Sequence, residues 1–505
     1  MAKDSGDGRP TTETYFGVAI DAAMRAPARH ELHAAMVTEN RGRPRKLEPL
    51  AYFTLVHATA LGQRPLQMTE VLETYRGLNP SQREQIGQPS LSYNQLTHFL
   101  VRVRQLVEQG RLDPVDLMNG ILEPSLPRDV PLSLAADSTD YESWGRIRAF
   151  WNSTNDAAPT NHEDSEAPPA DSTATRRSRS WPVLCDDGRL QRTADPDARD
   201  GHRSARNNRS AGAFVGYDLT LLVNTRPLGH PDPLPGFIAG ANLTSAGSHH
   251  AKAALEVVQR LVKQGQTILD VAADRAYNMA RTEFWTTPLR RLGIDPIFDL
   301  ASTQRGVGIG PVPGTLVIDG TVFTTAIPER LRKLPHPTFD MTSDERSELA
   351  HKYDERMVFA YKPMTTPGDN GKTRYRGPVR PDVVNNPIRC PNHPHSMRAP
   401  QDRFTTDCSG GKCGCSGTFT RDNDFMPNIR QRTPYGTTAW NADYHRRNAV
   451  ESANSNLRRD YSFDRGYTRV FGRIKNAVLL GFLIFAHNYS CITKHFLTRG
   501  KAPTC

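Results

Sequence analysis

The order of short apolar segments between residues 131 and 300 limits the fold to a small set. Period-two and continuous apolar patterns predict strands at 131–137, 214–223, 237–243, 267–274 and 295–300. An amphipathic helix is predicted at 248–264, where Gly265 ends it, and a second helix at 279–292. The chain therefore reads β-β-β-α-β-α-β, which is an α/β arrangement.

Two aspartates stand where predicted strands end. Asp137 and Asp274 each follow an Ala-Ala pair, so small side chains border both carboxylates and leave room for a metal ion or a DNA backbone. Asp270 competes with Asp274, and Asp140 competes with Asp137 although it falls after the predicted strand. An aspartate at a strand end can also simply cap the following turn.

A third carboxylate lies on a predicted helix near the C-terminus. Tyr444, Arg447, Glu451 and Arg458 stand at relative positions 0, 3, 7 and 14. On one continuous helix they fall within roughly 60° of one another. A carboxylate flanked by a phenol and two guanidinium groups suits the binding of a phosphodiester beside a metal ion. An ordinary surface Arg–Glu pair would leave the same pattern.

Acids on the first strand, the fourth strand and the last helix are the arrangement of a ribonuclease-H-like fold, with a mixed five-stranded sheet and helices. The chain resembles bacterial insertion-sequence transposases of the Asp-Asp-Glu type, in the group whose last helix carries Tyr-x2-Arg-x3-Glu-x6-Lys. The match uses Tyr444, Arg447 and Glu451, while Arg458 replaces the lysine. The second-acid motif of that group matches residues 274–277. The resemblance covers roughly residues 130–300 and 436–490.

The resemblance implies a function and roles for these residues. Asp137, Asp274 and Glu451 would hold two Mg²⁺ (or Mn²⁺) ions, and the enzyme would nick double-stranded DNA at the ends of its element and join the freed 3′-hydroxyl to target DNA. Arg447 and Arg458 would hold phosphates and Tyr444 would position the strand. The active complex would be a homodimer.

Two other functions remain open from the sequence. One is a DNA-binding relative that keeps the fold without turnover, although all three acids are present. The other is a ribonuclease-H-like nuclease that hydrolyses DNA and never joins it. A further alternative concerns Trp440, just before the helix, which either stacks on a DNA base or is buried.

Charge and hydropathy agree with a DNA partner. Lys plus Arg outnumber Asp plus Glu by 64 to 54, which gives a net charge of +10 and suits a polyanion. The polar N-terminus carries no signal-peptide pattern. The longest apolar run, residues 477–486, has about half of the ~20 residues that a membrane span needs, so it predicts a core helix. We expect no membrane association and a cytoplasmic location at the nucleoid.

Before the core we expect a disordered basic arm over residues 1–46 and a helical DNA-binding domain over 47–127. Arg41 and Arg43 belong to an Arg-Gly-Arg-Pro sequence, which can enter an A·T-rich minor groove or remain a solvated arm. The clearest helix covers 92–109, with a Ser92–Gln95 capping box. A small helical domain here resembles transposase end-recognition domains, and a purely structural cap is the alternative.

The core is expected in two parts, residues 128–300 and 436–495, followed by a tail over 496–505. Residues 151–212 have few apolar side chains, which predicts a disordered, linker-like insertion that touches DNA or stays solvated. Residues 301–435 form a second, β-containing insertion domain. It begins with a hairpin signal around Asp319-Gly320 and continues with a helix over about 342–361.

Cysteines in the second insertion suggest a metal. Four of the seven cysteines lie within 26 residues, beside two histidines. A tetrahedral zinc site would draw on Cys390, His393, Cys413 and Cys415, with Cys408 or His395 as substitutes. The other interpretation is a set of free, reduced thiols in a loop.

Overall fold

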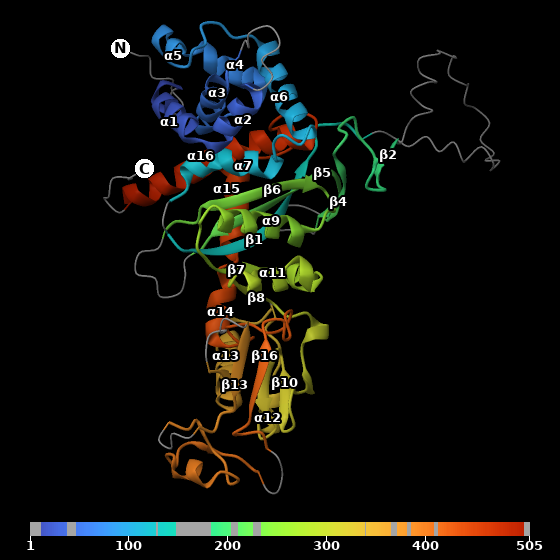
Figure 1. Ribbon diagram of the computed structural model, residues 1–505, viewed down its shortest axis with the longest axis vertical. Coiled ribbons are helices and arrows are strands. Elements are labelled where there is room, and N and C mark those ends of the chain that lie inside the picture. Colours follow the sequence, from blue (N-terminus) through green and yellow to red (C-terminus); the bar gives the residue numbers. More distant parts are fainter. Residues whose placement is uncertain are drawn as a thin grey trace, which may run out of the picture.

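The computed structural model describes residues 12–37, 47–127, 130–147, 183–203, 211–225, 234–338, 340–364, 371–380, 385–408 and 413–498. The molecule is elongated and has three parts along its long axis (Figure 1). The N-terminal helices lie at one end, a mixed sheet lies in the centre, and the residue 301–435 insertion lies at the other end.

The central sheet has six strands, one more than the five expected. They are β1 (Leu132–Glu142), β4 (Arg199–Arg203), β5 (Gly212–Asn224), β6 (Ile238–Ser245), β7 (Ile268–Ala273) and β8 (Asp295–Phe298). The order is β4-β5-β1-β7-β8, and β6 also pairs with β5. β1 runs antiparallel to β5 and parallel to β7, and β7 runs parallel to β8. The sheet is therefore mixed, and β1 is its central strand.

Alternation along β1 separates the two faces of the sheet. Leu132, Leu134 and Ala136 pack into the core beneath α9 (His250–Lys263). Ala135 and Tyr141 face the opposite core, which contains α15 (Asn448–Tyr461) and α16 (Arg473–Thr498). Side chains of odd-numbered β1 residues therefore point toward α15.

The N-terminal helices pack around α16. They are α1 (Thr12–Arg25), α2 (Pro27–Val37), α3 (Pro49–Leu61), α4 (Met68–Arg76), α5 (Pro80–Gln85), α6 (Tyr93–Glu108) and α7 (Pro114–Leu122). By length and composition α16 could cross a membrane, but 72% of its most apolar window is buried inside the protein. α16 is therefore the central helix of this helical domain.

The prediction of a disordered arm over residues 1–46 was wrong for its described part. α1 and α2 are ordered, and Ala19, Ala22 and Ala28 are fully buried. At the contact with α7, a Cβ on Gly120 would lie 2.8 Å from the backbone nitrogen of Ala28. Small side chains allow the helices to approach this closely, and they contribute little to an apolar pattern in the sequence. Residues 38–46 lie outside the described part of the chain.

The linker prediction for residues 151–212 was wrong for 183–203. This segment forms β2 (Val183–Leu184), β3 (Leu190–Gln191) and β4. Its buried Asp195 accepts hydrogen bonds from Tyr217 Oη (2.7 Å), Ser143 Oγ (2.7 Å) and the Gly472 amide (2.8 Å). Hydrogen bonds from three segments to this one carboxylate hold residues 183–203 in place, although the stretch has no large apolar surface. Residues 151–182 and 204–210 lie outside the description.

The helix expected at 279–292 is divided. α10 (Arg275–Met279) and α11 (Thr286–Arg291) flank an irregular segment that contains one short 3₁₀ turn. Trp285, with φ −148° and ψ −75°, is not helical, and its indole is buried beneath the sheet. Burial of this side chain determines the break, which the periodicity did not reveal.

The second insertion contains three small sheets. They are β9 (Val307–Ile309), β10 (Thr315–Ile318) and β11 (Thr321–Thr324); β12 (Lys362–Pro363), β13 (Lys372–Arg376) and β16 (Thr418–Asp422); and β14 (Ile388–Arg389) with β15 (Phe404–Thr405). The hairpin prediction was correct, because Asp319 and Gly320 have φ of 46° and 78°, as a type I′ turn requires. α12 (Glu329–Arg332) and α13 (Ser343–Arg356) follow, and α13 begins at the predicted Thr342 cap.

Candidate active site

Asp137 and Asp274 lie side by side on neighbouring parallel strands. The last matched pair of β1 and β7 is Ala136 with Ala273, and each aspartate is the next residue. Adjacent strands are about 4.8 Å apart, which puts both carboxyl groups at one place on the sheet. Asp137 is not at the end of its strand as expected, since β1 continues to Glu142 along its antiparallel partner β5. The end of β7, not that of β1, defines this position.

The Asp137 carboxylate points toward α15. Ala136 faces α9, so the alternation of β1 turns Asp137 to the opposite side, where α15 packs on the sheet. Val450, Ala453 and Leu457 form the buried stripe of α15. Glu451 is in the first turn of α15, with 48% of its side chain exposed. Three acids from β1, from the end of β7 and from α15 thus converge on one region.

The single helix expected at 444–458 is interrupted. α14 (Thr438–His445) ends one turn before α15 begins, and Arg447 is the N-cap residue of α15. The backbone between them tightens to i→i+3 hydrogen bonds, with Arg447 N donating to Tyr444 O (3.0 Å) and Val450 N donating to Arg447 O (3.1 Å). Because these residues keep right-handed backbone angles, Tyr444, Arg447 and Glu451 remain close together.

Arg447 is ion-paired to Glu451 and feels the charges of the two aspartates. Its guanidinium donates to Glu451 Oε1 at 2.8 Å. Burial lowers the pKa of Arg447, but the charges of Tyr444, Glu451, Asp137 and Asp274 outweigh burial and raise this pKa above its ordinary value. One cation therefore stands within the electrostatic reach of all three carboxylates.

Tyr277 lies behind the acids, in the core on the α9 side of the sheet. The Tyr277 hydroxyl lies 3.3 Å from Ser138 Oγ, and the Ser138 amide donates to Asp137 Oδ1 at 2.8 Å. Burial, followed by the charges of Asp137 and Asp274, raises the pKa of Tyr277 well above its usual value. Tyr277 is the aromatic residue of the motif at 274–277, whereas nothing in the sequence pattern indicated Ser138.

Asp274 caps α10 and also borders Asp137. It accepts hydrogen bonds from the amides of Ala276 (2.8 Å) and Tyr277 (3.4 Å), and so it caps α10. Tyr444 approaches from α14, where burial raises its pKa to about 12 and the negative charges of Asp299 and Asp274 add to this. The cap holds the Asp274 carboxylate in a fixed orientation beside Asp137.

Asp270 belongs to a buried ion network and not to the exposed acids. It lies on the same face of β7 as Asp274, yet its side chain is only 5% exposed. Arg446 lies 2.9 Å from it and Arg432 lies 3.5 Å from it, and Ser133 Oγ donates at 3.2 Å. These partners use the carboxylate to hold the α14–α15 junction against β7. No local pattern indicates the Arg446 contact, since the two residues are 176 positions apart.

Arg458, for which the resemblance implies a phosphate contact, is bonded within the protein in this structure. Its guanidinium donates to Thr139 Oγ1 and to the Asp140 carbonyl, both at 3.0 Å, and reaches the Asp140 carboxylate at 3.4 Å. About two turns beyond Glu451, α15 lies against β1, so this position faces the strand. Arg458 therefore fastens α15 to the sheet, and Asp140 is engaged in the same contact.

Trp440 is buried, with 3% exposure, so its assignment to DNA stacking was wrong. Its ring stacks on Tyr444 with centroids 4.9 Å apart, and its Nε1 donates to the Phe298 carbonyl at 3.2 Å. Trp440 therefore supports Tyr444 from behind. Arg41 and Arg43 lie outside the described residues.

The cysteines of the insertion converge as well. Cys390, Cys408, Cys413 and Cys415 have all four Sγ atoms within 4.8 Å of one another. His393 is outside this cluster, and its Nε2 lies 3.0 Å from Ser416 Oγ. The four residues that converge are therefore the alternative set, in which Cys408 takes the place of His393. Among the described residues, the three carboxylates do not form so compact a group.

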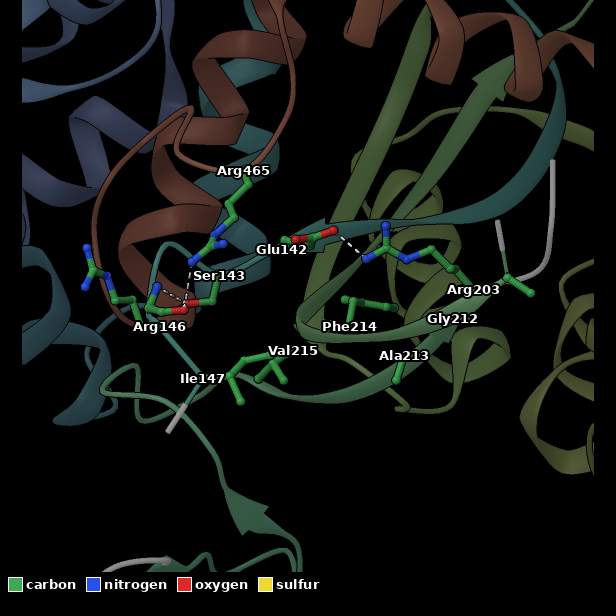
Figure 2. Close-up of a pocket in the computed structure, with 12 residues that line it drawn as sticks. Glu142, Ser143, Arg146, Ile147, Arg203, Gly212, Ala213, Phe214, Val215 and Arg465 are labelled. Carbon is green, nitrogen blue, oxygen red and sulfur yellow. Dashed lines mark hydrogen bonds and ion pairs between the residues drawn. The ribbon is translucent and has the colours of Figure 1, made fainter. Parts of the chain in front are cut away.

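A cavity of about 520 Å³ lies at the far end of β1, beyond Asp137. Arg146, Arg203 and Arg465 line it (Figure 2). Glu142 is the one acid among its lining residues, and Arg203 is ion-paired to it, as Figure 2 shows. The lining is basic, so this cavity suits an anion and is not the site of the three acids.

Comparison with known proteins gives no relative from which to assign this site. No protein-family model matches the chain, and no curated protein matches it.

Proposed function

We propose that this chain is a DNA transposase with a ribonuclease-H-like catalytic core, which binds the ends of its mobile element and catalyses metal-dependent strand cleavage and strand transfer. The observation that carries the proposal is the position of Arg447 among Asp137, Asp274 and Glu451, which come from three separate elements. A surface ion pair alone would need only Arg447 and Glu451.

The topology supports the proposed core. Read across the sheet, β6-β5-β1-β7-β8 places the first strand of the core in the middle, antiparallel to the second and parallel to the fourth. This is the strand order expected when acids of the first strand, the fourth strand and a late helix are to meet. β4 extends the far end of β5 and does not alter that order.

The donor set fits Mg²⁺ or Mn²⁺. Asp137, Asp274 and Glu451 offer the hard oxygen ligands that these ions prefer, and they would hold the proposed pair of ions. Glu451 is half-exposed and reachable, whereas Asp270 is buried and neutralised. When bound, such ions activate the attacking oxygen and stabilise the leaving oxygen of a phosphodiester.

The residues around the acids would bind and orient the DNA. Arg447 keeps 18% of its side chain exposed, so it can donate charge-assisted hydrogen bonds to a phosphate while it orients Glu451. Tyr444, supported by Trp440, forms the adjoining wall. The arginines of the cavity in Figure 2 come from the segment after β1 (Arg146), from β4 (Arg203) and from the segment after α15 (Arg465), and they offer further contacts to a DNA backbone.

The proposal extends to partners and location. Double-stranded DNA is the substrate, as both element end and target, and the net charge of +10 favours its approach. Two ends must be held together, so the active complex would be a homodimer in the cytoplasm, at the nucleoid. The N-terminal helices would recognise the element ends.

The first prediction concerns Glu451→Gln, tested on duplexes that carry the ends of the DNA element encoding this chain. With Mg²⁺ or Mn²⁺, wild type should cut at the ends and the variant should not, because it loses a charged ligand. Both should bind the ends equally, since Glu451 is half-exposed and supports no core packing. Asp460→Asn is the matched control, because it removes a carboxylate of the same helix that pairs only locally with Arg459 (2.7 Å).

The outcomes separate the alternatives. Cutting by wild type and by Asp460→Asn, but not by Glu451→Gln, would support the acid triad. Joining of a pre-cut 3′-hydroxyl end to plasmid DNA separates a transposase from a nuclease that only hydrolyses. Tight end binding without cutting by any form would overturn the enzymatic proposal in favour of a DNA-binding relative.

A further inference from the structure

The second insertion carries a cluster that the proposed DNA chemistry does not use. Its four cysteines come from three segments at the outer end of the molecule (Figure 1): Cys390 follows β14, Cys408 follows β15, and Cys413 and Cys415 precede β16. We infer that Cys390, Cys408, Cys413 and Cys415 bind one Zn²⁺ ion as a tetrahedral, all-thiolate structural site. This inference does not depend on the proposed function.

Sulfur–sulfur distances agree with zinc and not with disulfides. The Sγ atoms of Cys390 and Cys413 are 3.7 Å apart, and those of Cys408 and Cys415 are 4.0 Å apart. A tetrahedron with Zn–S bonds of about 2.3 Å has edges of about 3.8 Å. A disulfide bond would bring two sulfurs to about 2.05 Å. Four sulfurs around one point at this separation surround a space of the size of a zinc ion.

Local backbone structure holds the first two ligands. β14 and β15 are a parallel pair in which Ile388 matches Phe404, and each strand ends shortly before a cysteine. After Cys390 the chain turns back, with the His393 amide donating to the Cys390 carbonyl at 2.9 Å. This pairing delivers Cys390 and Cys408 to the same side of the cluster.

The last two ligands depend on a glycine. Gly414, between Cys413 and Cys415, has φ of +68°, and a Cβ at this position would lie 2.1 Å from the carbonyl oxygen of Gly314. Glycine is therefore required for a turn tight enough to aim both flanking thiols at one point. This geometry accounts for the short Cys-x-Cys spacing.

The surroundings suit bound thiolates. The Thr406 hydroxyl lies 3.0 Å from Cys408 Sγ, and the Thr324 hydroxyl lies 3.4 Å from Cys415 Sγ. The Thr406 hydroxyl can donate to a metal-bound Cys408 sulfur and orient it, whereas the Thr324 hydroxyl donates to the Cys413 carbonyl and only lies beside Cys415. Cys390 and Cys415 are fully buried, which protects the site from solvent.

Zinc at this position would fasten residues 385–408 to the rest of the insertion. The Val379 amide donates to the Cys415 carbonyl at 2.8 Å, and the hydroxyls of Thr324 and Tyr361 donate to the carbonyls of Cys413 and Gly414. By contrast, the secondary structure of residues 385–408 is limited to the two-residue strands β14 and β15 and one short 3₁₀ helix, Pro394–Arg398. The metal would thus supply the cross-link that such short strands lack.

The test is metal analysis of the full-length chain purified without added metal. We expect about one zinc and no iron per chain. After replacement by Co²⁺, the visible spectrum should show the bands of tetrahedral cobalt with sulfur ligands. Cys390→Ser and Cys415→Ser should lose the metal or shift these bands. His393→Ala and Cys185→Ser are the matched controls and should leave both readouts unchanged.

A second measurement does not depend on variants that fold. Of the seven cysteines in the native chain, four should resist alkylation until a chelator is added, as mass spectrometry would show. Iron in place of zinc, loss of zinc from His393→Ala, or rapid alkylation of all four thiols would overturn the inference. A native mass lower by four hydrogens would do so as well, because it would reveal two disulfides.

Discussion

At the scale of single residues, Asp270 and Asp274 differ in role because they contact different residues. Asp270 is buried between Arg446 and Arg432, whereas Asp274 borders Asp137 and caps a short helix. The first arrangement stabilises the α14–α15 junction, and the second presents an oxygen to the candidate metal site. The same substitution at the two positions should therefore have opposite consequences.

We predict that Asp270→Asn lowers the free energy of unfolding by about 3–5 kcal/mol, because it removes the nearer counterion of the buried Arg446 cation and leaves it Asp443 at 3.4 Å. Asp274→Asn should change stability by less than about 1 kcal/mol, since asparagine also caps helices, while it abolishes DNA cutting. Urea unfolding and end-cutting assays on both variants test this. A stable, cutting-deficient Asp270→Asn would mean that Asp270 is the second metal ligand.

Burial also decides the role of Trp440. Its ring fills the space between Phe298 and Tyr444 and is 3% exposed. Trp440→Ala should cost about 3–5 kcal/mol of stability through the cavity it leaves. Trp440→Phe should restore most of that stability and leave end binding unchanged, as measured by urea unfolding and gel shift. A large loss of DNA binding in a stable Trp440→Phe would contradict a purely supporting role.

At the scale of elements, the α3–α16 contact contains a histidine without polar partners. Both ring nitrogens of His57 are buried and lack a hydrogen-bond partner, and the ring packs 4.6 Å from Phe482 and 4.3 Å from Phe485. Burial lowers the pKa of His57 from 6.5 to about 3. The unfolded chain therefore binds a proton at a higher pH than the folded chain does.

It follows that His57 makes the helical domain sensitive to acid. Its contribution to stability is complete above pH 6.5 and is lost as the pH falls toward 3, at about 1.4 kcal/mol per pH unit. Between pH 7 and pH 5, His57→Leu should reduce the pH dependence of the unfolding free energy by about 2 kcal/mol. His98→Leu, at an exposed position of α6, is the control and should leave the dependence unchanged. An unaltered dependence in His57→Leu would contradict a buried neutral His57.

Elements with local signals could be predicted from the sequence. α6 and α13 begin at the capping boxes of Ser92 and Thr342, and the β10–β11 hairpin turns at Asp319-Gly320, because each signal involves residues close in sequence. α1 and α2 were missed, since alanine-rich helices carry little apolar pattern. Contacts such as Asp195 with Gly472 depend on tertiary packing across 277 residues, which no periodicity encodes.

The candidate site shows the same division. Strand ends and the spacing from Tyr444 to Glu451 indicated the three acids and Arg447. The internal roles of Arg458, Asp270 and Trp440 did not follow, because each depends on which element packs against that side chain. The cysteine cluster was predicted only in part: spacing indicated the cysteines, but the fold brings Cys408 and not His393 to the other three.

At the scale of the whole molecule, the chain combines a net charge of +10 with three parts arranged along one axis (Figure 1). An elongated basic molecule can contact a duplex at several separated points. Each neutralised phosphate releases a counterion, so the binding constant should fall steeply as salt rises. This property belongs to the charge of the whole chain and not to Asp137, Asp274 and Glu451.

We predict that binding of the full chain to a labelled element-end duplex weakens by about 10³–10⁵-fold between 50 and 200 mM salt, the range for six to ten phosphate contacts. Glu451→Gln should show the same slope of log K against log salt, because it contacts no phosphate. Arg447→Ala should reduce the slope by about one contact. Arg458→Ala should leave the slope unchanged, since that guanidinium is bonded to Thr139 and Asp140 within the protein.

Fluorescence anisotropy at several salt concentrations measures all four slopes. Equal slopes for Arg447→Ala and wild type would remove Arg447 from the DNA contact, and a flat wild-type slope would argue against DNA as the partner.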